Sequence, residues 1–401
     1  MKKSTIIVAG HVGHGRNTLV GRLLYETGFV SEDISGIIND SETADHKNNF
    51  VSTAEQPTRQ DEADIPRIEF KTPRRNYSFI IPTDHEAFLR HMVTGTIEAD
   101  VAILVIDPSH GLLDQTCQYA YLLAMFGIKE IIIVINKMDI KYNNRVRFWE
   151  ISEEATELLK KLNVHVIDII PTSAQYGDNI TAKSSKMDWN TSVPLMKSLD
   201  YFSAASNLTQ LPLRLIVQSS FLIDGKTKIL AKVISGKLFK DHQLTFGPTY
   251  QTTRVLSIEI ANQQRTSANS GESVVLTLED IKYLERGQVG FNVCHPPLTT
   301  DFLIAKVFWL GVDSLKPTDK IDILCGTQRC RGHVEKIMDI INPISPDIDC
   351  SRFDQLAESQ IANIGIKLDF PICIDLFDKL PGLGKFGLLQ DNRIVGGGTF
   401  R

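Results

Sequence analysis

The chain has 401 residues, of which 42% are hydrophobic and 23% are charged, and its net charge is −5. This length suffices for two or three domains, and the composition is ordinary for a globular protein in water. The negative charge gives no general attraction to nucleic acid. No apolar run reaches the length of a membrane span, and the hydrophobic start is too short for a signal peptide. We therefore expect a cytoplasmic protein without a membrane partner.

The first segment with a chemical pattern follows an apolar, β-rich run at residues 5–9. Two glycines, Gly10 and Gly15, stand in the loop after it, and a stretch with helical spacing comes next. In the phosphate-loop pattern G-x-x-x-x-G-K-[ST], backbone N–H groups cradle phosphates, the lysine reaches the β- and γ-phosphates, and the hydroxyl holds Mg²⁺. Here Arg16 stands at the lysine position and Asn17 at the hydroxyl position. Taken alone, the loop fits an ordinary glycine-rich turn equally well.

The following residues predict a doubly wound α/β domain over residues 1–206. The polar stretch at 29–67 is typical of a lid, a switch or disorder, and a hairpin at 68–81 and a helix from about residue 84 come after it. Continuous Val, Ile and Leu runs then mark strands buried on both faces of a parallel sheet. The strands are expected at residues 101–106, 131–135 and 164–170, and the helices at 114–126, 146–162 and 193–202.

From about residue 207 the pattern changes to short strands separated by turn signals, which predicts all-β structure. A break at Pro296-Pro297 suggests two barrels, over residues 207–298 and 299–401. The first set of strands is expected at residues 213–218, 228–235, 243–246, 253–260 and 273–278. The second set is expected at residues 302–309, 320–325, 327–337, 360–368, 387–389 and 394–399.

The strongest chemical signal is Asn136-Lys137-Met138-Asp139, directly after the strand at 131–135. Ligands bind beyond the carboxyl ends of parallel strands. The Asp139 carboxylate can accept two hydrogen bonds from guanine N1 and its exocyclic amine, the Lys137 stem can lie along the base, and Asn136 can tie this loop to the phosphate loop. A backbone N–H of the later segment 171–174 could bind the guanine oxygen. The alternative is a helix N-cap; the second loop in the right order favours guanine recognition.

Several stretches resemble the translation-factor superfamily of GTPases. The stretch GHVGHGRNTL is similar to the superfamily's GHVDHGKSTL, and IEFKTPRRNYSFII resembles the hairpin before the second switch of elongation factor Tu. Others, among them GIKEIIIVINKMDI, KVFWLGVDSLKPTDKIDI and NRIVGGGTF, resemble the GTPase subunit of sulfate adenylyltransferase. The resemblance covers nearly the whole chain and implies an α/β doubly wound P-loop GTPase domain followed by two all-β barrels.

The resemblance also implies a guanine-nucleotide site. Its candidate residues lie in the phosphate loop and in the two base-reading loops: Gly10, His14, Gly15, Arg16, Asn17, Thr18, Asn136, Lys137, Asp139, Ser173 and Ala174. His85 stands at the position of the family's water-positioning histidine and is the catalytic candidate. A helix-start residue is the alternative for His85, and a loop-packing residue is the alternative for His14.

The departures from the family concern the metal and the γ-phosphate. In the second switch, D-x-P-G-H, an alignment on His85 places Ile81 where the family has the Asp that holds Mg²⁺ through water. In the first switch, Glu62 stands where the family has a magnesium-binding Thr. Together with Arg16 and Asn17, four positions have changed. We therefore expect weak binding of GTP or GDP, no metal ligands, Mg²⁺ bound weakly or not at all, and weak or lost GTP hydrolysis.

These observations leave three functions open. The first is a guanine-nucleotide-binding protein built like the sulfate adenylyltransferase GTPase subunit, with slow or absent hydrolysis. The second is a nucleotide-free pseudo-GTPase that works as an interaction or regulatory subunit for a protein partner, such as an adenylyltransferase-type subunit. The third is a factor like elongation factor Tu that binds aminoacyl-tRNA, and the altered switches argue against it.

Overall fold

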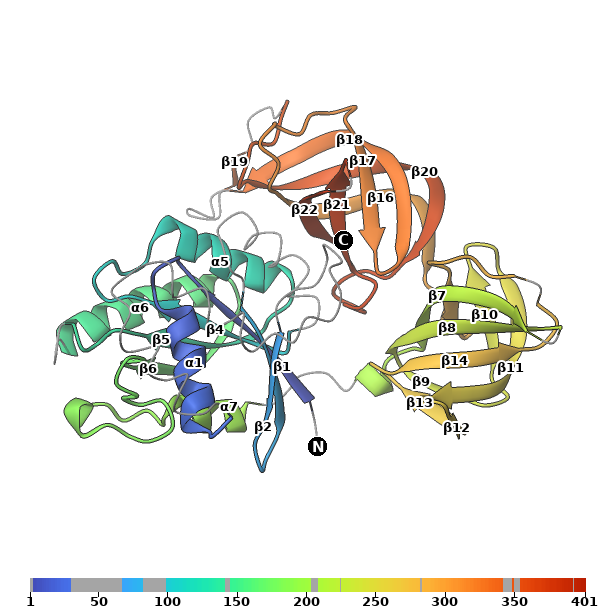
Figure 1. Cartoon of the computed structure of the whole chain (residues 1–401). Helices are drawn as coiled ribbons and strands as arrows, with labels where there is room; N and C mark the ends of the chain where they lie inside the picture. The colour runs from blue at the N-terminus through green and yellow to red at the C-terminus, as the bar shows by residue number, and fades with distance from the viewer. Residues whose placement is uncertain are drawn as a thin grey trace. The chain divides into compact units, whose positions relative to one another are not determined.

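The computed structural model describes residues 3–29, 67–81, 99–140, 145–202, 208–223, 225–281, 283–341, 348–349, 354–391 and 393–401. The chain divides into two compact units, Met1–Ala205 and Ser206–Arg401 (Figure 1). The first unit is an α/β structure, and the second is built from β-strands. This arrangement confirms the predicted fold class, a doubly wound α/β domain followed by β-barrels.

The first unit is organised around one six-stranded sheet in the order β2-β3-β1-β4-β5-β6. All neighbouring strands are parallel except β2 and β3, which form the predicted hairpin. The strands are β1 (Lys3–Gly10), β2 (Arg67–Lys71), β3 (Asn76–Ile80), β4 (Val101–Ile106), β5 (Glu130–Ile135) and β6 (His165–Pro171). The helices are α1 (Arg16–Glu26), α5 (Asp114–Met125), α6 (Arg145–Lys161) and α7 (Leu195–Tyr201).

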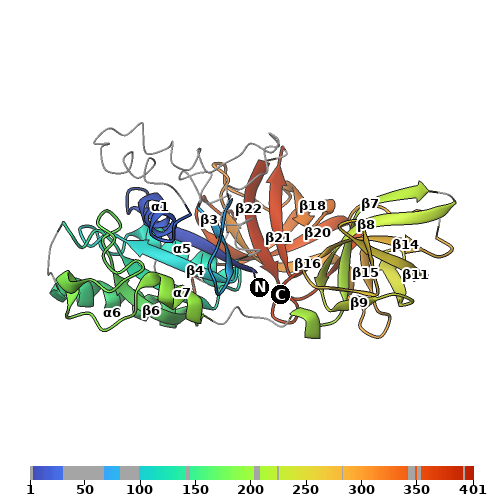
Figure 2. The same cartoon turned by 60° about the horizontal axis from the view of Figure 1, so that its bottom comes forward.

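The central strands of this sheet are buried on both faces. Every residue of β4 is buried, as its unbroken apolar sequence predicts for a strand with helices on both sides. Leucines of α1 and α7 pack in one cluster with alternate residues of β1, β4 and β5. In the view of Figure 2, α1 lies above β4 and α6 lies below it. The predicted elements of this unit lie within two residues of their observed limits, whereas the helix expected from residue 84 lies outside the described residues.

The second unit contains two antiparallel barrels. The first has the strand order β10-β15-β7-β8-β14-β11, is closed by pairing of β10 with β11, and carries β12 at its edge. Its strands are β7 (Arg214–Ile223), β8 (Lys226–Ser235), β10 (Gln243–Gly247), β11 (Gln251–Ile260), β12 (Gln263–Arg265), β14 (Ser273–Leu278) and β15 (Val289–Phe291). A separate small ribbon pairs β9 (Lys237–Phe239) with β13 (Ser267–Asn269).

The other barrel has the order β17-β21-β22-β16-β20-β18, is closed by pairing of β17 with β18, and carries β19 at its edge. Its strands are β16 (Leu298–Trp309), β17 (Lys320–Cys325), β18 (Gln328–Ile341), β19 (Ile348–Asp349), β20 (Ile361–Ile374), β21 (Lys385–Gln390) and β22 (Arg393–Phe400). Each strand predicted in this unit is present. The strands that the sequence does not reveal are β9, β12, β13, β15 and β19, which are too short to show an alternating pattern.

A buried ion pair joins the two barrels. Arg214, at the start of β7, is 3% exposed. Two of its guanidinium nitrogens donate to the two carboxylate oxygens of Asp375, at 2.8 and 2.9 Å. The third nitrogen of the guanidinium donates to the carbonyls of Leu213 and His295. The core of the second barrel also takes in Ile216 and Phe291 from the first. The first barrel has a core of its own, and the two barrels pack against each other through these residues. The predicted boundary near residue 298 stays a prediction.

Removal of one partner from this pair should be costly, because the other charge stays buried. We expect Asp375→Ala to lower the free energy of unfolding of the second unit by about 3–5 kcal/mol, measured by urea denaturation. Glu279→Ala, which breaks the exposed pair with Arg254, is the control and should leave the urea midpoint nearly unchanged. Equal midpoints for the two variants would show that the buried pair does not hold the barrels together.

Candidate functional site

The candidate site lies where the parallel strands of the first unit end. Gly10 closes β1, Asp107 follows β4, Asn136 follows β5 and Thr172 follows β6. These strands are neighbours in the sheet, so their carboxyl ends form one edge. Ligands of open α/β sheets bind at this edge.

Two glycines are required by the close packing of the phosphate loop. Gly10 and Gly15 both have positive φ angles, 150° and 89°. A Cβ atom on Gly10 would clash with the carbonyl oxygen of Val105, and one on Gly15 would clash with the side-chain nitrogen of Asn136. The G-x-x-x-x-G spacing therefore lets the loop approach both β4 and the loop after β5.

The Asn136 side chain connects three loops. It is 1% exposed, and its nitrogen donates to the carbonyl oxygen of His14 at 3.0 Å. Its oxygen accepts from the hydroxyl of Thr172 at 3.2 Å and from the backbone N–H of Ala174 at 3.0 Å. The tie to the phosphate loop is the one that the sequence indicated. The Ala174 N–H is one of the backbone N–H groups of the segment 171–174 that we considered for a guanine oxygen, and it donates to Asn136.

Asp139 and Ser173 meet across two loops. The Ser173 hydroxyl donates to one carboxylate oxygen of Asp139 at 2.5 Å. The side chain of Asp139 is partly exposed, and its second oxygen has no hydrogen bond within the described part of the chain. A carboxylate held by one oxygen can present the other to two adjacent N–H donors.

Lys137 pairs with a carboxylate that the sequence analysis did not single out. Its ammonium lies 2.9 Å from Asp107, whose side chain is 3% exposed. Burial raises the pKa of Asp107, but hydrogen bonds from Lys137 and Ser109 outweigh burial and hold the pKa below its usual value. Lys137 itself has a left-handed backbone, with φ of 60°. Asp107 follows β4 as Asn136 follows β5, so the strand-end rule applied to Asn136 could also have identified it.

His14 belongs to the phosphate loop, and its side chain is buried, at 1% exposure. Its Nδ1 lies 3.3 Å from the carbonyl oxygen of Val105 and 3.3 Å from the N–H of Asp107. Burial lowers the pKa of His14 from 6.5 to about 4, and the hydrogen bond to Val105 opposes this only in part. His14 also contacts the rings of His11 and His110, with centroid distances of 5.1 and 5.8 Å.

The residues at the lysine and hydroxyl positions begin α1. Arg16 is 6% exposed, and burial lowers the pKa of its guanidinium, which Tyr119 of α5 opposes. Asn17 and Thr18 are partly exposed. The N-terminus of α1 has no side-chain cap, and unpaired N–H groups at a helix N-terminus attract anions.

The remaining candidates belong to the switches. His85 and Glu62 lie outside the described residues, whereas Ile81 is described and is 1% exposed. Among the described residues, no group of three or more His, Cys, Asp or Glu side chains is arranged to hold a metal ion.

Comparison with known families decides what kind of protein this is. The elongation factor Tu GTP binding domain family matches residues 1–241, and the GTP-eEF1A C-terminal domain-like family matches residues 303–401. The chain belongs to the elongation factor Tu GTP binding domain family. Membership confirms the resemblance to translation-factor GTPases and implies guanine-nucleotide binding.

Curated relatives of the family align over nearly the whole chain. Elongation factor 1-alpha of Nanoarchaeum equitans is 29% identical over 99% of this chain and 95% of its own length. Elongation factor 1-alpha of Methanopyrus kandleri is 29% identical over 97% of this chain and 95% of its own length. Sulfate adenylyltransferase subunit 1 of Aeromonas hydrophila is 29% identical over 98% of this chain and 84% of its own length. The relatives therefore include elongation factors 1-alpha and a sulfate adenylyltransferase subunit, the second of which is a protein type that the sequence analysis named.

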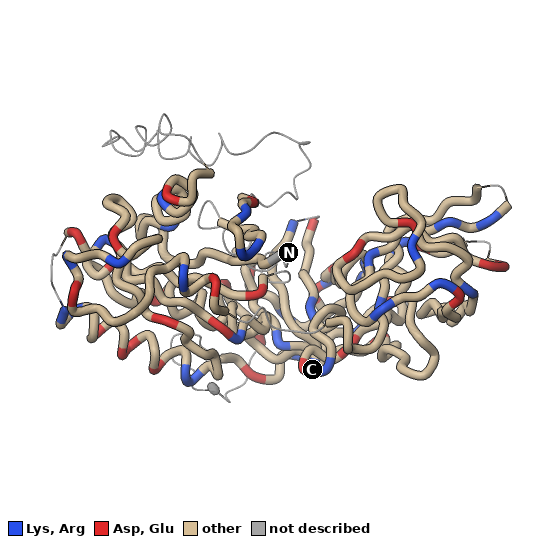
Figure 3. The backbone as a smooth tube through the Cα atoms, turned by 90° about the horizontal axis from the view of Figure 1, so that it is seen from below, with Lys and Arg blue, Asp and Glu red and all other residues tan. Residues whose placement is uncertain are grey.

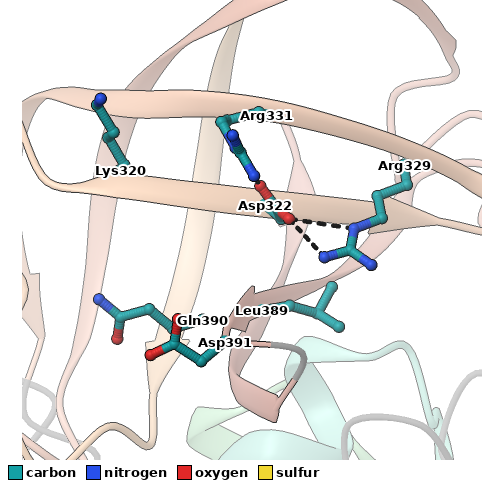
Figure 4. A pocket seen from close by; sticks show the side chains of 7 residues that line it. All are labelled: Lys320, Asp322, Arg329, Arg331, Leu389, Gln390 and Asp391. Carbon is teal, nitrogen blue, oxygen red and sulfur yellow. Dashed lines mark hydrogen bonds and ion pairs between the residues drawn. The ribbon is translucent and has the colours of Figure 1, made fainter.

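A cavity of about 380 Å³ lies on the second barrel (Figure 4). It is lined by Lys320, Asp322, Arg329, Arg331, Leu389, Gln390 and Asp391. Asp322 accepts from both arginines, at 2.6 and 3.2 Å. Since two of its three cations are already paired, this cavity is not strongly basic.

Charged residues of both signs are interspersed along both units (Figure 3). This mixture agrees with the small net charge of −5. Within the described ranges, no helix is both long and apolar enough to cross a lipid bilayer.

The low pKa of His14 predicts loss of stability in acid. Because the folded-state pKa, about 4, lies below the usual 6.5, the unfolded chain binds this proton first, and stability falls as the pH drops from 6.5 toward 4. This difference in pKa corresponds to on the order of 3 kcal/mol of folding stability. We expect His14→Gln to reduce the loss of stability between pH 7 and pH 5, measured by urea denaturation. An unchanged loss in the variant would contradict a neutral, buried His14.

Proposed function

We propose that this chain binds guanine nucleotides through its base-reading loops, with GTP hydrolysis weak or lost. The observation that carries the proposal is the contrast between two parts of the site. Asn136 holds the base-reading loops in place, and Asp139 is oriented by Ser173. Arg16, at the position of the phosphate-binding lysine, is buried.

In the proposed complex, Asp139 reads the base. One oxygen accepts from Ser173, and the other is left for guanine N1–H and the exocyclic amine. Adenine does not present two adjacent donors there, so the carboxylate selects guanine. The support for this role is the partly exposed position of Asp139 beyond β5, beside the loop that follows β6.

The donors for Mg²⁺ do not fit a normal site. Magnesium prefers oxygen ligands in near-octahedral geometry, usually carboxylates and phosphates. Ile81, at the position of the family's metal-binding Asp, is apolar and buried. Asn17 offers a neutral amide in place of a hydroxyl. We therefore derive no step through a metal ion.

Slow hydrolysis follows from the same substitutions. Phosphoryl transfer is catalysed almost entirely by positioning and by neutralising charge on the phosphates. A planar guanidinium at Arg16 does not replace a compact lysine ammonium at a phosphate loop. The catalytic role proposed for His85 stays a prediction.

A second candidate function is that of an interaction subunit that works without nucleotide. One relative is named as subunit 1 of sulfate adenylyltransferase, and this name favours a protein partner of adenylyltransferase type for this chain as well. The interspersed charges in Figure 3 do not favour a tRNA backbone as the ligand. Partner capture that is unaffected by Asp139→Asn would support this candidate over nucleotide binding.

A change of base specificity tests the role of Asp139. Asn presents one acceptor and one donor, which match xanthine rather than guanine, and Ser173 can still donate to the Asn oxygen. We expect Asp139→Asn to weaken GDP binding by about tenfold or more and to improve binding of xanthosine diphosphate, measured by titration calorimetry. Asp178→Asn, a carboxylate bonded to Ser184 and Lys186, is the matched control. Unchanged GDP affinity in Asp139→Asn would overturn the proposed base contact.

A magnesium titration tests the phosphate half of the site. We expect wild-type affinity for GTP and GDP to change less than about threefold when Mg²⁺ is added, because the donors for the ion are missing. Arg16→Lys should tighten GDP binding by about tenfold, since it restores a compact cation. A strong Mg²⁺ dependence in the wild type, or weaker binding in Arg16→Lys, would contradict the proposed loss of the metal and phosphate contacts.

A further inference from the structure

Strand β7 ends in three consecutive apolar residues that are all exposed. Phe221, Leu222 and Ile223 have exposed fractions of 53%, 69% and 45%. Earlier in the same strand, the side chains of Leu215 and Val217 are fully buried in the core of the barrel. Single exposed apolar residues are common on protein surfaces. A run of three is expected only where the run has a function.

The same part of β7 has a backbone edge with no strand beside it. On one side, β8 pairs with β7 as far as Ile223. On the other side, β15 pairs only with residues 214–216, and the segment before β15 adds backbone hydrogen bonds to Val217. Within the described residues, the outer edge of residues 219–223 therefore has no strand partner (Figure 1). An unpaired edge of N–H and C=O groups is a template for one more strand.

This edge lacks the residues that usually prevent strand addition. Proteins commonly protect an exposed edge with charged side chains or proline on the edge strand. Residues 219–223 have the sequence Ser-Ser-Phe-Leu-Ile, which contains neither. Exposed apolar side chains and an unpaired backbone edge thus occur on the same few residues. This combination suits an extended peptide, which pairs its backbone with the edge and packs alternate side chains on the sheet.

The neighbouring strand gives this face a positive charge. Phe221 is opposite Lys228 and Ile223 is opposite Lys226 in the pairing of β7 with β8. Residues opposite one another in an antiparallel pair share one face of the sheet, so both lysines flank the apolar side chains. Glu259 lies 3.7 Å from Lys228 and compensates one of the two charges. Acidic side chains on an added strand would therefore be attracted to this face.

We propose that the outer edge of β7 is a docking site for an extended, acidic segment of a protein partner. The segment adds to the barrel as a strand beside residues 219–223. Its apolar side chains pack on Phe221 and Ile223, and its carboxylates lie toward Lys226 and Lys228. The site belongs to the second unit and uses none of the residues assigned to the nucleotide. It therefore does not depend on the proposed function.

The test is selection of peptides on the full chain. A phage library of short random peptides is panned against the wild-type protein, and the enriched peptides are synthesised and titrated by fluorescence anisotropy. We expect enriched sequences in which apolar and polar residues alternate and acidic residues outnumber basic ones, with an affinity that falls as salt is added. Bound peptide should slow hydrogen exchange of backbone amides within residues 219–223, because these amides gain partners.

Variants at the edge separate this site from other apolar surfaces. The double variant Phe221→Thr, Ile223→Thr should weaken peptide binding by about tenfold or more, and it should fold normally because threonine is favourable in exposed strands. Lys226→Glu should weaken binding of the acidic peptides as well. Phe370→Thr, which removes an exposed aromatic side chain from β20, is the matched control and should bind as wild type. Enriched peptides that bind the double variant equally, or that leave the amides of residues 219–223 unprotected, overturn the proposal.

A second copy of the chain is the other occupant that this edge would accept. Sedimentation velocity of the chain without peptide distinguishes the two cases. We expect the wild type and the double variant to sediment alike, as monomers, at micromolar concentration. A wild-type dimer that the double variant abolishes would overturn the proposal, because the edge would then serve self-association.

Discussion

The Asn136 side chain is the contact on which the candidate site depends. It is buried and joins the phosphate loop, through the His14 carbonyl, to the loop that follows β6, through Thr172 and Ala174. No apolar side chain can make these three hydrogen bonds, and each of the groups would be left unpaired in its absence. Because Gly15 allows this close approach, the phosphate loop and the base-reading loops keep a fixed geometry relative to one another.

This fixed framework explains how the two halves of the site can differ. Asp139 depends on Ser173 and on the position of its loop beyond β5, and neither depends on the phosphate contacts. Under the proposed function, Arg16 and Ile81 stand where the family has groups that hold phosphate and metal. The glycines Gly10 and Gly15 have the positive φ angles that the phosphate loop requires. In the proposed function, this fold loses phosphate chemistry without losing base recognition.

Much of this arrangement was predictable from the sequence. The buried strands β4 and β5 are marked by unbroken apolar runs, and the rule that ligands bind at strand ends located Asn136 and Asp139. The strands of two or three residues, such as β15, were missed because so few residues show no alternation.

Side-chain placement in the site was less predictable. The partner of the Ala174 N–H and the burial of Arg16 depend on packing between segments far apart in the chain. Local sequence patterns do not predict such contacts. The Lys137–Asp107 pair could have been found, since Asp107 also follows a central strand.

The central claim is that the base is recognised normally while the phosphates are held weakly. The most direct measurement is the ratio of the dissociation constants of guanosine and GTP at pH 8 with excess Mg²⁺. We predict that the three phosphates improve affinity by less than about 100-fold, or about 2.7 kcal/mol. An improvement of many thousandfold would contradict the account, because it would require the intact phosphate and metal contacts that Arg16, Asn17 and Ile81 replace.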